Sequence, residues 1–269
     1  MEKTFPIDTV SKAMRAVGDY YRQQFKVNPV PTDWPGFKSR FDEIEKRVLR
    51  ELQEGLRDAF PDTPWEGGEF DFGEQTASPR ISDFWLCDSM DGAIQYMQQL
   101  PGWTINLVLM RQGKPFFAAI YEPLERELFW AIAGQGAYLN DTQIAPSKKV
   151  DPQLLLVTFD HPPFANKIVG LNTRIGDTVA ELIGRFGTVR NYGPHGLQIA
   201  SVAAGRIDVF CQEGLDTYNW LPGILIAQEA GATVATTQGE TWQWGDDSLF
   251  VSSPVVAKEF FASKKAANV

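Results

Sequence analysis

Hydrophobic residues in the first sixty positions recur at helical spacing. Residues 10–25 carry apolar side chains close to every third or fourth position, and residues 35–60 carry a second stripe of the same kind. Each stripe predicts a helix that buries one face. Pro29, Pro31 and Pro35 lie between them and exclude a continuous helix. The sequence therefore predicts a helix, a proline-rich break and a second helix.

Alternating or continuous apolar runs replace the helical spacing after residue 65. The predicted strands and hairpin segments are 69–72, 84–87, 103–111, 115–121, 127–131, 134–140, 154–159, 207–211, 233–236 and 249–252. The predicted later helices are 178–186, 197–204 and 219–230. Strands follow one another before residue 150 and alternate with helices after it, which favours an α/β fold with a mixed first half. We expect an N-terminal α+β metal-binding half over 1–150 and a C-terminal α/β half over 151–269.

Composition excludes several classes of protein. A hydrophobic content of 43% over 269 residues is globular. A net charge of −9 argues against nucleic acid and anionic membrane surfaces as partners. No secretory signal is visible, apolar runs are too short to span a bilayer, and Cys87 and Cys211 stand in apolar runs. We therefore expect a cytoplasmic protein.

The chemistry concentrates in Trp85 to Ala93, where a strand runs into Asp88-Ser89-Met90-Asp91-Gly92. Two carboxylates repel by about 4 kcal/mol at a separation near 4 Å in a partly buried setting, and a hard cation removes that penalty. Gly92 allows close backbone approach, and a helix starting near Ala93 offers N–H groups to an anion. The alternative is a surface turn with two solvated aspartates.

Five stretches in order are similar to motifs of the inositol monophosphatase family of magnesium-dependent, lithium-sensitive phosphatases. Trp85 to Ala93 resembles that family's Trp-Ile-x-Asp-Pro-Leu/Ile-Asp-Gly-Thr motif, and the other four are residues 73–75, 134–140, 203–208 and 226–232. The agreement extends from about residue 10 to residue 255. The resemblance implies the layered α-β-α-β-α sandwich of inositol monophosphatase and fructose-1,6-bisphosphatase.

The resemblance also implies a metal site. Glu74, Asp88 and the carbonyl of Met90 would hold a first Mg²⁺, for which Mn²⁺ could substitute. Asp88 would bridge to a second cation, held also by Asp91 and by a side chain at position 219, which is Asn219 here. Glu74 and Asp91 thereby count as catalytic residues as well as ligands.

Further roles concern the phosphate and the water. The backbone N–H groups of Gly92 and Ala93 would bind the phosphate, and Asp42 would help to orient a metal-activated water. From the residues alone, Asp42 also fits a solvated helix carboxylate. His161 and His195, each beside a proline, fit loop packing better than catalysis.

Several positions depart from the family pattern. Asn219 stands ten residues before Glu229, where the family has an aspartate, so the second cation is expected to bind more weakly. Asp216 could replace Asn219 as a ligand only in a different loop register. Ala93 lacks the hydroxyl of the family threonine, which helps to activate the nucleophilic water. General-base catalysis typically raises the reaction rate by about 10²–10⁴-fold. Gln75 replaces a glutamate, Ser89 a proline, and residues 192–196 a Gly-Ser/Thr segment.

Two functions remain open at this point. The first is a Mg²⁺-dependent phosphomonoesterase that hydrolyses a small metabolite ester, such as an inositol or sugar phosphate, and Glu74, Asp88 and Asp91 favour it. The second is a catalytically degenerate relative that binds a phosphorylated ligand or a protein partner without rapid turnover, and Ala93 and Asn219 favour it. The resemblance adds the expectation of a homodimer.

Overall fold

The computed structural model describes residues 5–66, 75–77, 82–163 and 165–267. Its helices are α1 (Ile7–Gln24), α2 (Trp34–Leu56), α4 (Ala93–Met97), α5 (Leu171–Arg185), α6 (His195–Ala203), α7 (Thr217–Glu229) and α8 (Pro254–Ala267). The strand predicted at 69–72 lies outside the described residues.

The first sheet has seven strands in sequence order. They are β1 (Trp65–Glu66), β2 (Phe84–Asp91), β3 (Thr104–Arg111), β4 (Lys114–Glu122), β5 (Glu127–Ile132), β6 (Ala137–Leu139) and β7 (Thr142–Gln143). β1 is parallel to β2, and every later pair is antiparallel. The predicted hairpins at 103–121 and 127–140 match β3–β4 and β5–β6, because short turns between apolar strands specify antiparallel neighbours.

The second sheet has five strands in the order β11-β12-β10-β8-β9. They are β8 (Leu156–Asp160), β9 (Thr188–Asn191), β10 (Val209–Glu213), β11 (Thr233–Ala235) and β12 (Ser248–Ser252). β8 is parallel to β9 and β10, whereas β12 is antiparallel to β10 and β11. Parallel neighbours require crossover helices, which are α5 and α6 here.

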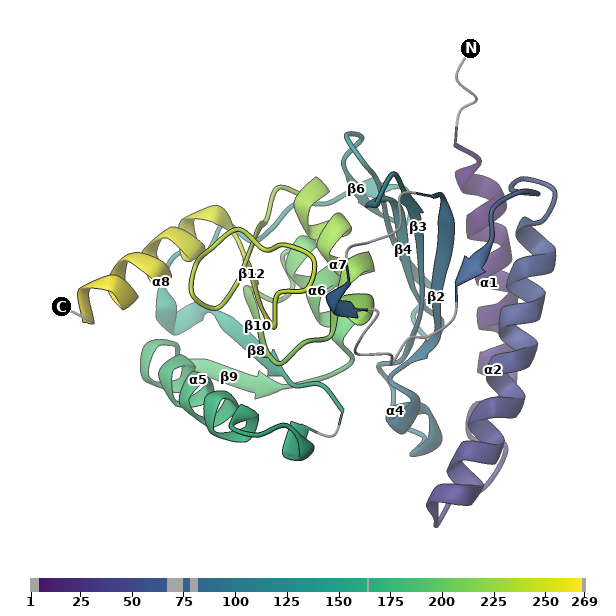
Figure 1. Ribbon diagram of the computed structural model, residues 1–269, viewed down its shortest axis with the longest axis horizontal. Helices are drawn as coiled ribbons and strands as arrows, with labels where there is room; N and C mark the ends of the chain where they lie inside the picture. Colours follow the sequence, from purple (N-terminus) through teal and green to yellow (C-terminus); the bar gives the residue numbers. More distant parts are fainter. Residues whose placement is uncertain (1–4, 67–74, 78–81, 164, 268–269) are drawn as a thin grey trace.

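The elements stack in five layers, α1/α2, first sheet, α6/α7, second sheet and α5/α8 (Figure 1). Alternate residues of β3 show why: Leu107 and Leu109 pack toward α1 and α2, while Val108 and Met110 pack toward α6 and α7. A strand covered on both faces is apolar at nearly every position, and successive side chains point to opposite faces. The α-β-α-β-α sandwich is the fold class that the family resemblance implies, and the structure confirms it.

Local signals account for the start of α2 but not for that of α5. The Asp33 carboxylate accepts a hydrogen bond from the Gly36 N–H at 2.8 Å, and Pro35 stands in the first turn, so α2 begins where both cap it. The predicted helix at 178–186 is too short, because α5 begins at Leu171, which is buried against the core. Among the described residues, no helix has the length and apolar character needed to cross a bilayer.

Candidate active site

A β-bulge brings the two aspartates of the central motif to one face of the first sheet. Asp88 pairs with Asn106 on β3, and Asp91 pairs with Thr104, so three steps on β2 oppose two on β3. Residues three apart on a regular strand point to opposite faces, and one extra residue restores the same face. The bulge therefore directs both carboxylates to the side on which α7 packs.

Asp91 is buried and tightly held. Its Oδ2 accepts hydrogen bonds from Asn106 Nδ2 at 2.8 Å and from the Gly196 N–H at 3.0 Å. Asp91 as a whole is 4% exposed. Asn106 is oriented in turn by the Thr104 hydroxyl, which donates to Asn106 Oδ1 at 2.9 Å. Burial raises the pKa of Asp91 to about 6, although both hydrogen bonds and His195 favour the ionised form. Asp91 is consequently a carboxylate that gains from a nearby cation.

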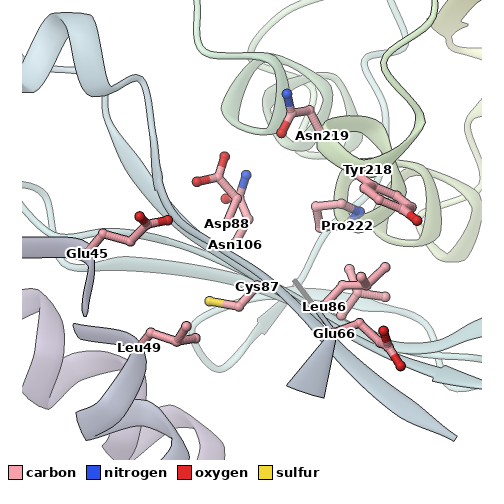
Figure 2. A pocket seen from close by; sticks show the side chains of 11 residues that line it. Glu45, Leu49, Glu66, Leu86, Cys87, Asp88, Asn106, Tyr218, Asn219 and Pro222 are labelled. Carbon is pink, nitrogen blue, oxygen red and sulfur yellow. The ribbon is translucent and has the colours of Figure 1, made fainter. Parts of the chain in front are cut away.

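A cavity of about 100 Å³ opens beside Asp88. Figure 2 shows Asp88 and Asn106 on the sheet, with Glu45 extending from α2 on one side and Asn219 from α7 on the other. Its remaining lining is mainly apolar and comes from Leu49, Glu66, Leu86, Cys87, Val108, Tyr218 and Pro222. Asp88 itself accepts the Met90 N–H at 2.9 Å, which fixes the turn that leads to Asp91.

Glu45, and not Asp42, is the α2 carboxylate that lines this cavity. Asp42 lies at the surface, where its carboxylate pairs with Lys38 at 3.0 Å one turn away. Burial, and secondarily the negative charge of Asp42, raise the pKa of Glu45. Residues three apart on a helix are neighbours on its surface, so Asp42 and Glu45 lie close together, and only Glu45 lines the cavity because the Asp42 carboxylate pairs with Lys38.

The N-terminus of α7 supplies Asn219 together with Asp216, the residue on which the alternative ligand assignment fell. Asn219 Nδ2 donates to Asp216 Oδ1 at 2.8 Å, and Gln212 Nε2 donates to Asp216 Oδ2 at 3.2 Å. Both oxygens of Asp216 thus accept protein hydrogen bonds, and Asn219, not Asp216, lines the cavity. Burial raises the pKa of Asp216, while His195 and the two amides oppose that rise.

His195 occupies a buried position among acidic groups, which corrects the expectation of simple loop packing. Its Nε2 lies 3.5 Å from Asp216 Oδ2, and its Nδ1 lies 3.8 Å from Asp160 Oδ2. Burial alone lowers the pKa of this imidazole, but Asp216, Asp160 and Asp91 outweigh that effect and raise it to about 9. The protonated ring therefore offsets part of the negative charge next to Asp91. His161 is exposed on the loop after β8.

Gly92 and Ala93 form the turn between β2 and α4. Gly92 has φ 90° and ψ 33°, a left-handed conformation that favours glycine. Its carbonyl accepts the Tyr96 N–H at 3.0 Å as the first hydrogen bond of the turn. Ala93 is the first residue of α4 and packs its methyl group against the α1/α2 core. Their amides thus stand at a bend next to Asp91.

The oxygen donors of the site fit a hard divalent cation. Asp88 and Asn219 face one cavity, and Asn219 Oδ1 is buried with no hydrogen-bond partner in the described part of the chain. An orphaned buried oxygen is costly unless a ligand satisfies it. Within the described ranges no three His, Cys, Asp or Glu side chains form a complete metal cluster, and Glu74 lies outside those ranges. The described residues therefore provide some, but not all, of the oxygen donors that a hard cation requires.

Two other motifs support the frame and not the site. The Glu229 carboxylate at the end of α7 accepts hydrogen bonds from the Gly134 N–H at 2.8 Å and from the Gly136 N–H at 2.9 Å. This clamp fastens the β5–β6 turn to α7. Asp208 likewise accepts from Lys149 Nζ at 2.6 Å and from the Leu156 N–H at 2.8 Å. The first motif fixes α7 against the first sheet, and the second fixes the start of β8 in the second sheet.

Asn106, Gln212 and Glu45 are site residues that the sequence analysis did not single out. The sequence could have indicated Glu45, because this carboxylate directly follows Ile44, a buried residue of the apolar stripe of α2. Asn106 is a polar residue inside an otherwise apolar strand, which also marks a special position. Gln212 has no comparable signal, since its role depends on Trp220, eight residues away.

The fold and this pocket define a class, the layered α/β proteins with an acidic, oxygen-lined site at a bulged strand. The inositol monophosphatase family matches residues 4–268, and the chain belongs to that family. It is 27% identical to the inositol-1-monophosphatase of Bacillus subtilis over 226 residues, which cover 81% of this chain and 80% of that protein. It is 25% identical to the Nus factor SuhB of Escherichia coli K12 over 260 residues, covering 94% and 93%.

Solved structures agree on the fold. The inositol monophosphatase (IMPase) of Thermotoga maritima superimposes with a TM-score of 0.76 at 22% identity, over 97% of this chain and 96% of that one. The SuhB protein of Bartonella henselae superimposes with a TM-score of 0.77 at 22% identity, over 96% and 98%. The similarity therefore extends over the whole sandwich.

Proposed function

We propose that this chain is a Mg²⁺-dependent phosphomonoesterase for a small ester such as an inositol or sugar phosphate. The observation that carries the proposal is the single cavity lined by Asp88, Asn219 and Glu45 beside the buried Asp91. Membership of the inositol monophosphatase family supports the reaction class. The substrate class is supported by the name of the Bacillus subtilis relative, an inositol-1-monophosphatase.

Each residue has a role in this proposal. Glu74, Asp88, the Met90 carbonyl, Asp91 and Asn219 would hold Mg²⁺ or Mn²⁺. When bound there, a divalent cation would neutralise part of the phosphate charge and would lower the pKa of a bound water toward neutral pH. The Gly92 and Ala93 N–H groups would hold the phosphate, since backbone amides at a turn bind anions.

Glu45 is the proposed base in place of Asp42. It lines the cavity opposite Asn219, and its pKa is raised by burial, so it is a better proton acceptor than an exposed carboxylate. Because Ala93 carries no hydroxyl, Glu45 would take the proton of the attacking water without a side-chain relay through position 93. Its carboxylate would also orient that water toward phosphorus.

The test is release of inorganic phosphate from inositol 1-phosphate, several sugar phosphates and p-nitrophenyl phosphate, with Mg²⁺, with Mn²⁺ and with a chelator. We expect metal-dependent release that the chelator abolishes. Asp91→Asn removes a charged ligand and should lower kcat/KM by about 10²-fold or more, in line with lost electrostatic stabilisation. Full Mg²⁺-dependent activity in Asp91→Asn would refute the site.

The alternative is a binding protein built on the same fold. Ala93 and Asn219 favour it, and so do the several relatives named Nus factor SuhB, since that name states no hydrolytic activity. Under this alternative, no ester releases phosphate, yet Mg²⁺ with inorganic phosphate raises the thermal unfolding temperature. The same panel and one melting experiment therefore separate the two functions.

A further inference from the structure

The amide of Asn219 has only one orientation in this structure. Its Nδ2 lies 2.8 Å from Asp216 Oδ1, and a carboxylate only accepts, so the NH₂ group must face Asp216. The carbonyl Oδ1 is thereby turned away from Asp216. It is buried without a hydrogen-bond partner in the described part of the chain, and Asn219 is 5% exposed. Asn219 lines the cavity that Asp88 also lines (Figure 2).

Asp216 is itself fixed from behind. Gln212 Nε2 donates to Asp216 Oδ2 at 3.2 Å, and the Trp220 indole Nε1–H donates to Gln212 Oε1 at 2.8 Å. An indole N–H only donates, so the Gln212 amide cannot turn over without setting donor against donor. His195 Nδ1 lies 2.8 Å from the same Oε1, and in the protonated ring it adds a second donor to that oxygen. Trp220 therefore sets Gln212, and Gln212 sets Asp216.

We propose that Asp216 is a positioning residue that turns Asn219 Oδ1 toward a divalent cation and supplies, from behind the amide, the negative charge that Asn219 lacks. This inference depends on the proposed metal site and deepens it. It also answers how Asp216 contributes: through Asn219, and not as a ligand in its place. A directly ligating aspartate would supply both an oxygen ligand and a negative charge. Here Asn219 would supply the oxygen, and Asp216, one hydrogen bond away, would supply the charge.

The substitution Asp216→Asn creates a conflict that the structure resolves in one way. An asparagine offers one oxygen and one NH₂ where Asp216 accepts from both Gln212 and Asn219. One of these two amides must then turn over, and Trp220 and His195 hold Gln212 in place. Asn219 turns instead, and its Nδ2 replaces Oδ1 in the cavity. An NH₂ group does not coordinate Mg²⁺ or Mn²⁺, which take oxygen ligands.

The experiment measures Mn²⁺ binding to the full chain by electron paramagnetic resonance of the free ion, without substrate. Substitution of residues that orient metal ligands typically costs 10–100-fold in affinity, so the dissociation constant of Asp216→Asn should rise by about that factor. The exchanged pair Asp216→Asn/Asn219→Asp places the donor at 216 and the acceptor at 219, so the hydrogen bond between the two residues forms again in the opposite direction and an oxygen at 219 faces the cavity. It should bind Mn²⁺ at least as tightly as the original protein.

Two controls separate positioning from general damage. Asp208→Asn alters another buried aspartate, which pairs with Lys149 away from the cavity, and should lower the melting temperature without changing Mn²⁺ affinity. Asp160→Asn removes a neighbouring charge that faces His195 but accepts nothing from Asn219, and should change affinity by less than about threefold. The first variant shows the effect of lost stability alone, and the second shows the effect of lost negative charge alone.

Each outcome decides something. Recovery of Mn²⁺ affinity in the exchanged pair after loss in Asp216→Asn supports the positioning role, because a purely structural defect would not be reversed by a second substitution. Unchanged Mn²⁺ affinity in a folded Asp216→Asn overturns the inference and leaves the proposed function standing. If Asp216→Asn does not fold, failure of the exchanged pair to bind Mn²⁺ overturns it. Absence of Mn²⁺ binding by the original protein overturns both.

Discussion

Replacement of Gly92 by alanine tests the turn that joins the proposed metal site to the proposed phosphate site. Gly92 has φ 90°, and a side chain in the left-handed region costs roughly 1–2 kcal/mol. A Cβ atom would also meet the Gly102 carbonyl oxygen at 3.0 Å and the Trp103 Cα and Cβ at 3.2 and 3.3 Å. Two of these three neighbours are backbone atoms, so the β2–α4 turn must shift.

We expect Gly92→Ala to lower the free energy of unfolding by about 2 kcal/mol, from the left-handed strain and a modest overpacking cost. The shift would also displace the Gly92 and Ala93 amides, and therefore weaken binding of inorganic phosphate in the presence of Mg²⁺. Stability is measured by urea unfolding followed by tryptophan fluorescence, for which the buried Trp85 and Trp103 are reporters. Phosphate affinity is measured by calorimetry on the same samples.

The matched control is Gly176→Ala in the middle of α5. Gly176 is exposed, its φ is not positive, and a Cβ there meets no atom within 4 Å. Alanine should therefore stabilise α5 by about 0.5–1 kcal/mol. Equal stabilities of Gly92→Ala and the original protein would refute the argument from the left-handed turn. A stability loss without any change in phosphate affinity would refute the assignment of these amides to phosphate.

Three further predictions follow from the same geometry. Glu45→Gln should lower kcat by about 10²-fold or more with little change in KM, whereas Asp42→Asn should lower it by less than twofold, and the reverse ranking would return the role to Asp42. Iodoacetamide should modify Cys87, which lines the cavity, and spare Cys211, because burial raises the pKa of that thiol. Mn²⁺ with phosphate should protect Cys87 from modification. The sites are identified by peptide mass mapping, and modification of Cys211 before Cys87 would contradict the predicted order. Because burial raises the pKa of Asp91 to about 6, a proton competes with the cation below that pH. Mn²⁺ affinity should then fall about tenfold between pH 7.5 and pH 5, and a flat profile would exclude Asp91 as the titrating ligand.

Many of the elements could be predicted from the sequence because they carry strong local patterns, whereas their arrangement in layers was implied by the family resemblance. The apolar stripe of α2 and the hairpin at 112–114 each specify their own structure. Weak patterns failed where packing decided the outcome. The first turns of α5 contain Asn172, Thr173 and Gly176, which are poor helix formers, yet α5 includes them. The C-terminal helix α8 was not predicted, although Val256, Ala257 and Phe260 bury one of its faces.

In the candidate site, the placement of single residues could not be predicted from local sequence patterns. Spacing identified Asp88 and Asp91, but the bulge that aligns them depends on the register between β2 and β3, which no local pattern encodes. The choice between Asp42 and Glu45 depends on the rotation of α2 about its axis. The role of Asp216 depends on a chain of hydrogen bonds from Trp220 through Gln212. Each of these is a property of tertiary contacts.

The proposed cation site has one ligand without charge. As that ligand, Asn219 would contribute only a neutral oxygen, while Asp216 lies behind it and a protonated His195 lies beside Asp216. Relative to a site with three ligating carboxylates, less negative charge faces the cavity. We expect weaker cation binding as a result, with release of the cation and of product correspondingly faster.

In the proposed site, Asp88 and Asn219 hold one divalent cation in the cavity next to the Gly92 turn. The most direct measurement is an anomalous difference map from crystals grown with Mn²⁺ and inorganic phosphate. We expect a peak in bonding contact with an Asp88 carboxylate oxygen and with Asn219 Oδ1, and phosphate at the Gly92 and Ala93 amides. A cavity without a peak, or a cation bound directly by Asp216 with Asn219 turned away, would contradict it.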